Sequence, residues 1–451
     1  MLSTAWKATK ASCMGSQPDG MHHVVVREHA RLTVDPAPTG SLVEAQVTET
    51  AFEWLCRESA RLSRTGASLV QIEGRRLLRL DNYVGVVETP CGTRIEILPK
   101  SVDGAEDAPA ARRLLKRMLA RCLDLPRRET GPADIEAFRT PLTEWVMHAF
   151  LEELSILVKK GIRFDYRAVR EQQPYLRGRL ETVRQLRQPP GRAHLFQIEH
   201  DVFDADRPEN RLLASALDIV RLRTREQRNW RLAHELAAVL HEVPRSQNVA
   251  ADFRRWQSNR LMGSYRAVRP WCALLLDESV PMSVHGAWRG KSLLFPMETV
   301  FERYVEVCLR AQLQPGARLR PQASHEYLCE HAGDRWFNLQ PDFLLEAGDS
   351  RIVLDTKWKR VDSHLIGTKD KYGLRQADFY QLFAYGHRYL GGAGDMLLVY
   401  PVTTDFREAL PPFNYTPELQ LAVVPFDLIS GRLMPVPKTF TERVASLLAP
   451  C

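Results

Sequence analysis

The amino-acid sequence predicts a multidomain α/β protein with a β-rich N-terminal domain, a middle region of helices and a hairpin, and a C-terminal α/β domain. The chain has 451 residues, of which 44% are hydrophobic, so it can bury a large core and divide into several domains. Short runs rich in Val, Ile and Leu, broken by Gly and Pro, fill residues 21–100. Helical spacing dominates much of 110–240, and both patterns alternate beyond residue 271.

These changes in pattern predict the domain boundaries. We expect a disordered leader at 1–20, because its residues are small, polar and aperiodic. The β-rich N-terminal domain is predicted at 21–135, the helical and hairpin middle region at 136–270, and the C-terminal α/β domain at 271–451. No internal repeat or low-complexity tract interrupts this order.

The charge balance favours a polyanionic partner. Lys and Arg number 62 against 55 Asp and Glu, which gives a formal net charge of +7, and the planar fork of Arg suits phosphate. The alternative is that frequent Arg reflects only genomic base composition, and charge alone does not separate the two.

Cysteine usage and hydropathy predict a cytoplasmic protein. The 8 cysteines are scattered without a CxxC pair, which is typical of a reducing compartment and argues against a zinc or iron–sulfur site. No run approaches the roughly 18 apolar residues that a membrane helix requires, and residues 1–20 lack the apolar stretch of a secretory signal.

Local patterns predict the elements of the first two domains. Residues 82–100 read as two strands joined by a turn that contains Pro90 and Gly92. Further along, 175–186 and 194–200 read as a long hairpin, whose tip at 187–192 is basic and stiffened by proline. Helical spacing predicts helices at 110–125, 141–158, 210–220 and 229–240.

The C-terminal domain contains a hairpin that predicts a catalytic site. Residues 337–346 and 351–358 are strand-like, and Gly348-Asp349 suits the turn between them. That turn pairs residue 347 with 350, so Asp342 lies across from Asp355 on one face of the hairpin. Strand periodicity places Lys357 on the same face, whereas Ile352, Leu354, Thr356 and Trp358 point to the other side.

Two facing carboxylates with a neighbouring amine suit phosphodiester hydrolysis, which needs a cation to offset charge on the phosphate and to activate water. Hard Mg²⁺ or Mn²⁺ fits oxygen ligands from Asp342 and Asp355 better than zinc does, and the carbonyl of Thr356 is a further ligand candidate. Lys357 would orient the water or stabilise the transition state. The alternative is a surface hairpin with exposed ion pairs.

Two helices add candidate residues. The spacing predicts a helix at 296–309 with Glu302 on its flank, where it is a candidate third carboxylate, and Glu298 one turn earlier competes for that role. A second helix at 377–389 places Gln381 and Tyr385 on one face, where they would contact phosphate or water.

The sequence predicts no nucleotide-binding loop. Residues 286–292 resemble one, but the first Gly is a residue too close and His285 stands at the required position.

Taken together, Pro341-Asp342, Asp355-x-Lys357, Glu302 and Gln381-x-x-x-Tyr385 resemble the RecB-like branch of the PD-(D/E)xK nucleases. More of the chain is similar to the McrC family. This similarity lies in residues 83–86, 95–100, 176–180, 206–213 and 355–359.

The McrC resemblance implies the nuclease subunit of an McrBC-type, 5-methylcytosine-dependent restriction system. The C-terminal domain would then be a PD-(D/E)xK restriction-endonuclease-like α/β domain that cleaves modified duplex DNA with Mg²⁺, Mn²⁺ being possible. Asp342, Asp355 and Glu302 would bind the metal. The catalytic set would be Asp342, Asp355, Lys357, Gln381 and Tyr385.

The resemblance also implies a partner, the McrB-like hexameric AAA+ GTPase, which reads methylcytosine and which McrC-like chains bind and stimulate. The N-terminal part would dock on this ring as a stalk that enters its pore, and the basic tip at 187–192 would contribute to it. Two alternatives stay open: a RecB-like nuclease that serves another motor in DNA repair, or a non-catalytic activator of the ring.

Overall fold

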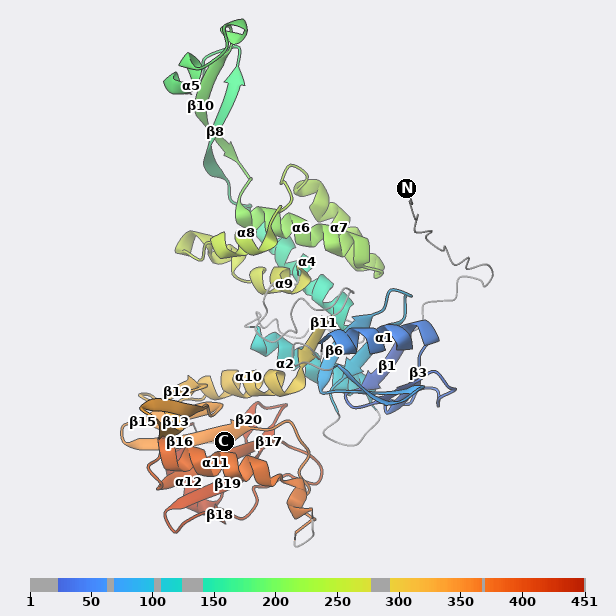
Figure 1. Ribbon diagram of the computed structural model, residues 1–451, viewed down its shortest axis with the longest axis vertical. Coiled ribbons are helices and arrows are strands. Elements are labelled where there is room, and N and C mark those ends of the chain that lie inside the picture. Colours follow the sequence, from blue (N-terminus) through green and yellow to red (C-terminus); the bar gives the residue numbers. More distant parts are fainter. Residues whose placement is uncertain are drawn as a thin grey trace, which may run out of the picture.

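The computed structural model of the chain describes residues 23–62, 69–100, 107–123, 141–276, 293–366 and 370–449. A slender stalk occupies one end of the long axis, and a layer of helices lies beneath it (Figure 1). Two small sheets lie beside that layer, and a larger sheet forms the opposite end. The predicted leader and the loop at 286–292 lie outside the described residues.

In its described residues, the N-terminal part contains two four-stranded sheets and the helix α1. The helix α1 (Glu49–Leu62) lies within the region predicted as β-rich, and its Phe52 and Leu55 join the same buried core as Leu32 and Leu78. The strands are β1 (His23–Arg27), β2 (Arg31–Thr33), β3 (Glu44–Gln46), β4 (Val70–Gly74), β5 (Leu77–Leu80), β6 (Tyr83–Glu88), β7 (Arg94–Leu98) and β11 (Leu293–Pro296). Their orders are β1-β7-β6-β11 and β3-β2-β5-β4.

The hairpin predicted at 82–100 is confirmed as β6 and β7, which pair antiparallel. Strand β11 pairs with the other side of β6 at Gly85, where a Cβ atom would lie 1.9 Å from the carbonyl oxygen of Leu293. Only glycine permits so close an approach of two backbones. A strand from beyond residue 271 therefore completes the N-terminal sheet.

The four predicted helices are confirmed. Three of them belong to a layer that connects the N-terminal sheets to the stalk, whereas the first packs against β7 (Figure 1). The buried carboxylate of Glu144 joins two of them, because it accepts hydrogen bonds from Thr224 Oγ1 at 2.8 Å and Asn229 Nδ2 at 2.9 Å. The elements are α2 (Ala108–Cys122), α4 (Leu142–Lys160), α6 (Pro208–Arg223), α7 (Gln227–Val239), α8 (Val249–Arg255), η3 (Arg260–Tyr265) and α9 (Arg269–Leu275).

The stalk differs from the predicted hairpin in its first strand. It consists of β8 (Asp165–Gln173), β9 (Arg179–Leu180), α5 (Thr182–Leu186), η2 (Pro190–Arg192) and β10 (Phe196–Asp204). Strand β10 pairs along its whole length with β8 and over only two residues with β9. The prediction of a strand at 175–186 is therefore wrong for most of its length, and 187–192 lies in the connection from α5 to β10.

Two local features explain this error. Gly178 adopts a left-handed φ of +66°, which ends any extended run before it reaches β9. Gln185 accepts a 2.8 Å hydrogen bond from the backbone nitrogen of Gln197 and so holds α5 against β10. Strand β8 is mostly polar and exposed on both faces, so no alternation of apolar residues marks it in the sequence.

The C-terminal part is built on a seven-stranded curled sheet. Its strands are β12 (Arg318–Pro321), β15 (Phe343–Ala347), β16 (Ser350–Thr356), β17 (Gly394–Pro401), β18 (Phe413–Asn414), β19 (Leu419–Asp427) and β20 (Arg432–Leu433). The path runs β12-β15-β16-β17-β19-β18, and β20 pairs with β19. The remaining elements are α10 (Met297–Arg310), η4 (Lys371–Gly373), α11 (Gln376–Tyr389), α12 (Lys438–Leu447) and a separate hairpin of β13 (Glu326–His331) and β14 (Asp334–Leu339).

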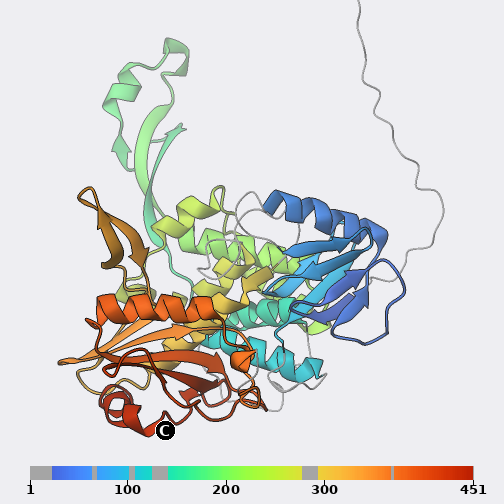
Figure 2. The ribbon, with the colours of Figure 1, turned by 60° about the horizontal axis from the view of Figure 1, so that its bottom comes forward.

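Both faces of this sheet are covered by helices. Ile352 and Leu354 of β16 share a core with residues of α10 and α12, whereas Val353 packs in a second core with Leu382 of α11. Figure 2 shows α11 lying across one face of the sheet. Because side chains alternate along a strand, Asp355 lies on the face of Val353, which is the α11 face.

The run predicted as one strand at 337–346 is divided in the structure. Its first residues belong to β14, which pairs with β13, and β15 begins only at Phe343. Phe337 has a positive φ of 58° within β14, where the pairing with β13 skips this residue.

No helix within the described ranges is long and apolar enough to cross a membrane.

Candidate functional site

The hairpin β15–β16 has the register that the Gly348-Asp349 turn predicts. Residue 347 pairs with 350, and the ladder continues to the pair Phe343 and Leu354. The ladder ends there, and Asp342 and Asp355 are the next residue outward on each side. The carboxylate of Asp342 caps the end of β16, because its Oδ2 accepts hydrogen bonds of 2.6 Å from both the backbone nitrogen and Oγ1 of Thr356.

Asp355 and Lys357 form an ion pair on the α11 face, as strand periodicity predicts. The Asp355 side chain is only 2% exposed, and burial followed by the charge of Asp342 raises the pKa of Asp355. Burial lowers the pKa of Lys357, but the charges of Asp355 and Asp342 outweigh burial, so the pKa of Lys357 is raised overall. Lys357 therefore stays protonated beside Asp342 and Asp355, which together with Glu302 are called the acidic cluster below.

The predicted helix at 296–309 is confirmed as α10, and it brings Glu302 into the same cluster. Burial and then the charge of Asp342 raise the pKa of Glu302 to about 7, while Lys357 acts in the opposite direction. Glu298 is exposed, and its charge acts on Lys100 instead. The structure therefore places Glu302 in the electrostatic field of Asp342.

Gln381 and Tyr385 share one face of α11, as predicted. Gln381 Nε2 donates a 2.6 Å hydrogen bond to the hydroxyl of Tyr385, which in turn donates to the carbonyl of Gln340 at 2.9 Å. Burial raises the pKa of Tyr385 to about 12, and the charges of Asp355 and Asp342 act in the same direction. Both side chains therefore border the acidic cluster.

Sequence reasoning missed several residues around this cluster. Lys359 Nζ lies 2.9 Å from Asp378 Oδ2, an ion pair that ties the end of β16 to the first turn of α11. Asp378 stands three residues before Gln381, so helical spacing offered a signal for it. Gln322 and Gln340 offered no such signal, because only the fold brings them close to Glu302 and Tyr385.

The donor chemistry of the cluster fits a hard divalent cation. Asp342, Asp355 and Glu302 offer only oxygen ligands, and burial combined with like charge raises the pKa of both Asp355 and Glu302. A cation would relieve that repulsion. In the described part of the chain, however, no group of three or more His, Cys, Asp or Glu side chains stands ready-made around a metal position, and Asp355 is instead paired with Lys357.

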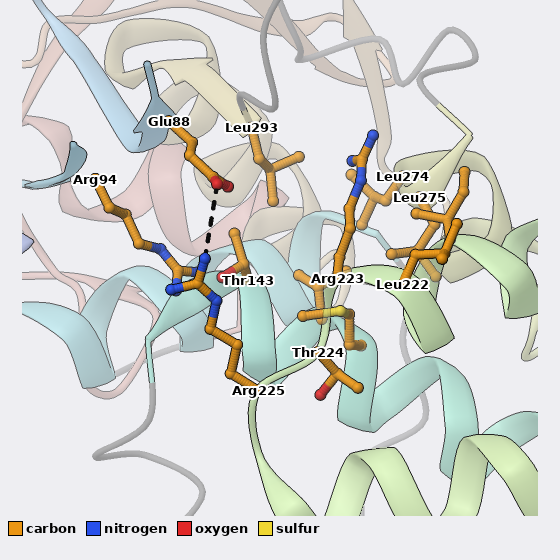
Figure 3. A pocket seen from close by; sticks show the side chains of 13 residues that line it. Glu88, Arg94, Thr143, Leu222, Arg223, Thr224, Arg225, Leu274, Leu275 and Leu293 are labelled. Carbon is orange, nitrogen blue, oxygen red and sulfur yellow. Dashed lines mark ion pairs between the residues drawn. The ribbon is translucent and has the colours of Figure 1, made fainter. Parts of the chain in front are cut away.

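A separate pocket lies away from these residues, between the N-terminal sheet and the helical layer (Figure 3). Its volume is about 870 Å³ including its open mouth. Arg94, Arg225 and Glu88 line its polar side, where Arg225 Nη2 lies 4.0 Å from Glu88 Oε1. None of the acidic cluster lines it, so its size has no bearing on the candidate site.

Comparison with known proteins gives the family. The sequence profile of the McrBC 5-methylcytosine restriction system component family matches residues 78–401. No curated protein matches the sequence. Among solved structures, the fold is similar to a chain in the half-complex of the tetradecameric assembly of Thermococcus gammatolerans McrB AAA+ hexamers with bound McrC. That similarity has a TM-score of 0.65 and 18% identity, and it covers 94% of this chain and 99% of that one.

A chain of the McrBC complex from the same organism is also similar, with a TM-score of 0.47 and 19% identity over 64% of this chain and 87% of that one. The resemblance to the McrC family that the sequence motifs carry is thus confirmed by the family profile. Because the profile matches most of the length of this chain, the chain belongs to the McrBC 5-methylcytosine restriction system component family.

Proposed function

We propose that this chain is the nuclease subunit of an McrBC-type system and hydrolyses modified duplex DNA with Mg²⁺ at a PD-(D/E)xK centre. The carrying observation is the hairpin β15–β16, which sets Asp342, Asp355 and Lys357 together beside Glu302. Membership of a restriction-system family agrees with this activity. A DNA substrate is also in keeping with the cytoplasmic location expected from cysteine usage.

In this proposal Glu302, Asp342 and Asp355 hold Mg²⁺, for which Mn²⁺ can substitute. When bound, the ion neutralises charge on the scissile phosphate and makes water a better nucleophile. The raised pKa of Lys357 keeps its ammonium charged at neutral pH, which favours stabilisation of negative charge over removal of a proton.

Gln381 and Tyr385 complete the catalytic set by contacting the phosphate or the attacking water from α11. The Gln381 amide retains a second N–H beyond the one it donates to Tyr385, so it has a donor to offer. Lys359, held by Asp378, keeps α11 in place against the end of β16.

We also propose that the chain docks on a hexameric AAA+ GTPase similar to McrB. The similar Thermococcus gammatolerans chain comes from an assembly of McrB AAA+ hexamers with bound McrC, and the similarity covers 94% of this chain. The stalk of β8 and β10 projects from the body (Figure 1) and exposes apolar side chains, including Tyr166, Leu186 and Phe203. Such a shape suits insertion into a ring.

The nuclease proposal is tested in the purified complex with its GTPase partner. Asp355→Ala is expected to abolish DNA cleavage while the partner continues to hydrolyse GTP, because the substitution removes a metal ligand and leaves the stalk intact. Asp349→Asn, at the exposed turn of the same hairpin, serves as the matched control and is expected to keep full cleavage. Persistent Mg²⁺-dependent cleavage by Asp355→Ala contradicts the proposal and favours a non-catalytic activator.

The docking proposal has its own test. Deleting residues 187–192 in the full-length chain is expected to abolish stimulation of the partner's GTPase, while the thermal unfolding transition of the chain stays unchanged. Unchanged stimulation by the deletion variant refutes a role for this segment.

A further inference from the structure

Gln322 forms hydrogen bonds with two of the acidic residues, Asp342 and Glu302. It follows β12 directly, and its backbone nitrogen donates a 2.8 Å hydrogen bond to the carbonyl oxygen of Asp342. Its side-chain Nε2 donates a 3.1 Å hydrogen bond to Oε1 of Glu302 on α10. One residue thus connects the backbone of Asp342, just before β15, to the helix that carries Glu302.

The backbone of Gln322 is strained in this position. Its φ is +46°, the left-handed region that costs a non-glycine residue on the order of 1 kcal/mol. A glycine would occupy this conformation without the cost but would have no amide to offer. The side chain is exposed, so burial of apolar surface does not account for a glutamine at this place.

Two hydrogen bonds orient the Gln322 amide. Gln340 Nε2 donates to Gln322 Oε1 at 3.3 Å, which leaves Gln322 Nε2 to donate to Glu302. An ionised carboxylate only accepts hydrogen bonds, so reversing the Gln322 amide would break both of them. The backbone of Gln340 is itself held from α11, because its carbonyl accepts the hydroxyl of Tyr385.

We propose that Gln322 is a positioning residue that holds the Glu302 carboxylate toward Asp342, so that Glu302 serves as the third carboxylate of the metal site. This inference rests on the proposed function and adds to it the residue that selects Glu302 over Glu298. Gln322 touches neither substrate nor metal in this role. It restricts the rotation of a long carboxylate side chain before the cation arrives, as hydrogen-bonding partners of metal ligands commonly do.

The test measures Mn²⁺ binding to the full-length chain without DNA, by titration calorimetry or by the loss of free-ion paramagnetic signal. Gln322→Ala is expected to weaken Mn²⁺ affinity about tenfold, within the range usual for partners of metal ligands. Glu298→Gln is expected to leave the affinity unchanged. The matched control is Gln314→Ala, which removes a glutamine whose amide donates to the carbonyl of Ala445 on α12.

A double substitution separates positioning from a general structural effect. In a Glu302→Gln background, Gln322→Ala is expected to cause no further loss of Mn²⁺ affinity, because the oriented carboxylate is already absent. A further loss in that background overturns the inference, as does wild-type affinity in Gln322→Ala itself. If the wild-type chain binds no Mn²⁺, the proposed metal site is wrong and the inference falls with it, whereas equal binding by wild type and Gln322→Ala overturns the inference alone.

Discussion

The indole nitrogen of Trp358 donates a 2.6 Å hydrogen bond to Oε1 of Glu28, across 330 positions of sequence. The same oxygen accepts the backbone N–H of Lys100 at 2.8 Å, and Lys100 Nζ donates to the carbonyl of Trp358 at 2.9 Å. Trp358 follows Lys357 directly. Residues at the ends of two strands of the N-terminal sheet therefore bind the chain one residue beyond the candidate catalytic lysine. These bonds join 95–100 to 355–359, two of the segments that carry the McrC resemblance.

Glu28→Ala is expected to lower the free energy of unfolding by about 2–4 kcal/mol, because it leaves one buried and one partly buried donor without their acceptor. Chemical denaturation followed by tryptophan fluorescence measures this loss. Glu53→Ala, on an exposed position of α1, is the control and is expected to change stability by less than about 0.5 kcal/mol. Equal effects of the two substitutions would show that the hydrogen bonds of Glu28 to Trp358 and Lys100 contribute nothing to stability.

Divalent cations are expected to stabilise the folded chain through the acidic cluster. Mn²⁺ at about 100 times its dissociation constant adds about 2.7 kcal/mol to a protein that binds it only when folded, and removal by a chelator reverses the gain. Thermal unfolding with and without Mn²⁺ measures the shift. Asp342→Asn is expected to abolish it, whereas Asp349→Asn keeps it. A shift that survives in Asp342→Asn would place the stabilising ion elsewhere.

Gly178→Ala is expected to impair the stalk without unfolding the body. A Cβ atom at this position would lie 2.5 Å from the carbonyl oxygen of Glu199 and 2.6 Å from Cβ of His200, so β9 must move away from β10. Stimulation of the partner's GTPase is expected to fall, while the main thermal transition is retained. Gly263→Ala, in η3 outside the stalk and with no atom within 4 Å of the added carbon, is the control. Full stimulation by Gly178→Ala would disprove a role for β9.

Lys116 is expected to make stability depend on pH. Burial, and then the charge of Arg112, lower the pKa of Lys116 to about 7, whereas an unfolded lysine has a pKa of about 10.4. Between these values the unfolded chain binds more protons than the folded one, so stability rises as pH rises through about 7 to 10. Denaturation of wild type and Lys116→Met at several pH values measures this difference. A stability difference between the two proteins that stays constant over that range contradicts a lowered pKa for Lys116.

Local chemistry made the core of the candidate site predictable. The Gly348-Asp349 turn sets the register of β15 and β16 through the geometry of a tight turn, and alternation along the strand then assigns Asp355 and Lys357 to one face. The spacing of Gln381 and Tyr385 on a helix needs only a period of 3.6 residues. In each case the residues that decide the geometry lie within a few positions of one another.

Other features had no local signal. Strand β8 is mostly polar and exposed on both faces, so no alternation of apolar residues marked it and the predicted hairpin took the wrong first strand. Helical spacing does not distinguish Glu298 from Glu302, since both belong to α10, and only the fold shows that the charge of Asp342 acts on Glu302.

By itself, the sequence determined the family, the helices α4, α6 and α7 and the register of the hairpin β15–β16, because propensity, periodicity and turn geometry act over short stretches of chain. Only the tertiary structure decided that Gln322 reaches Glu302 and that Glu28 reaches Trp358. Those contacts join residues from separate strands and helices, so they exist only after the hydrophobic cores have packed the elements together.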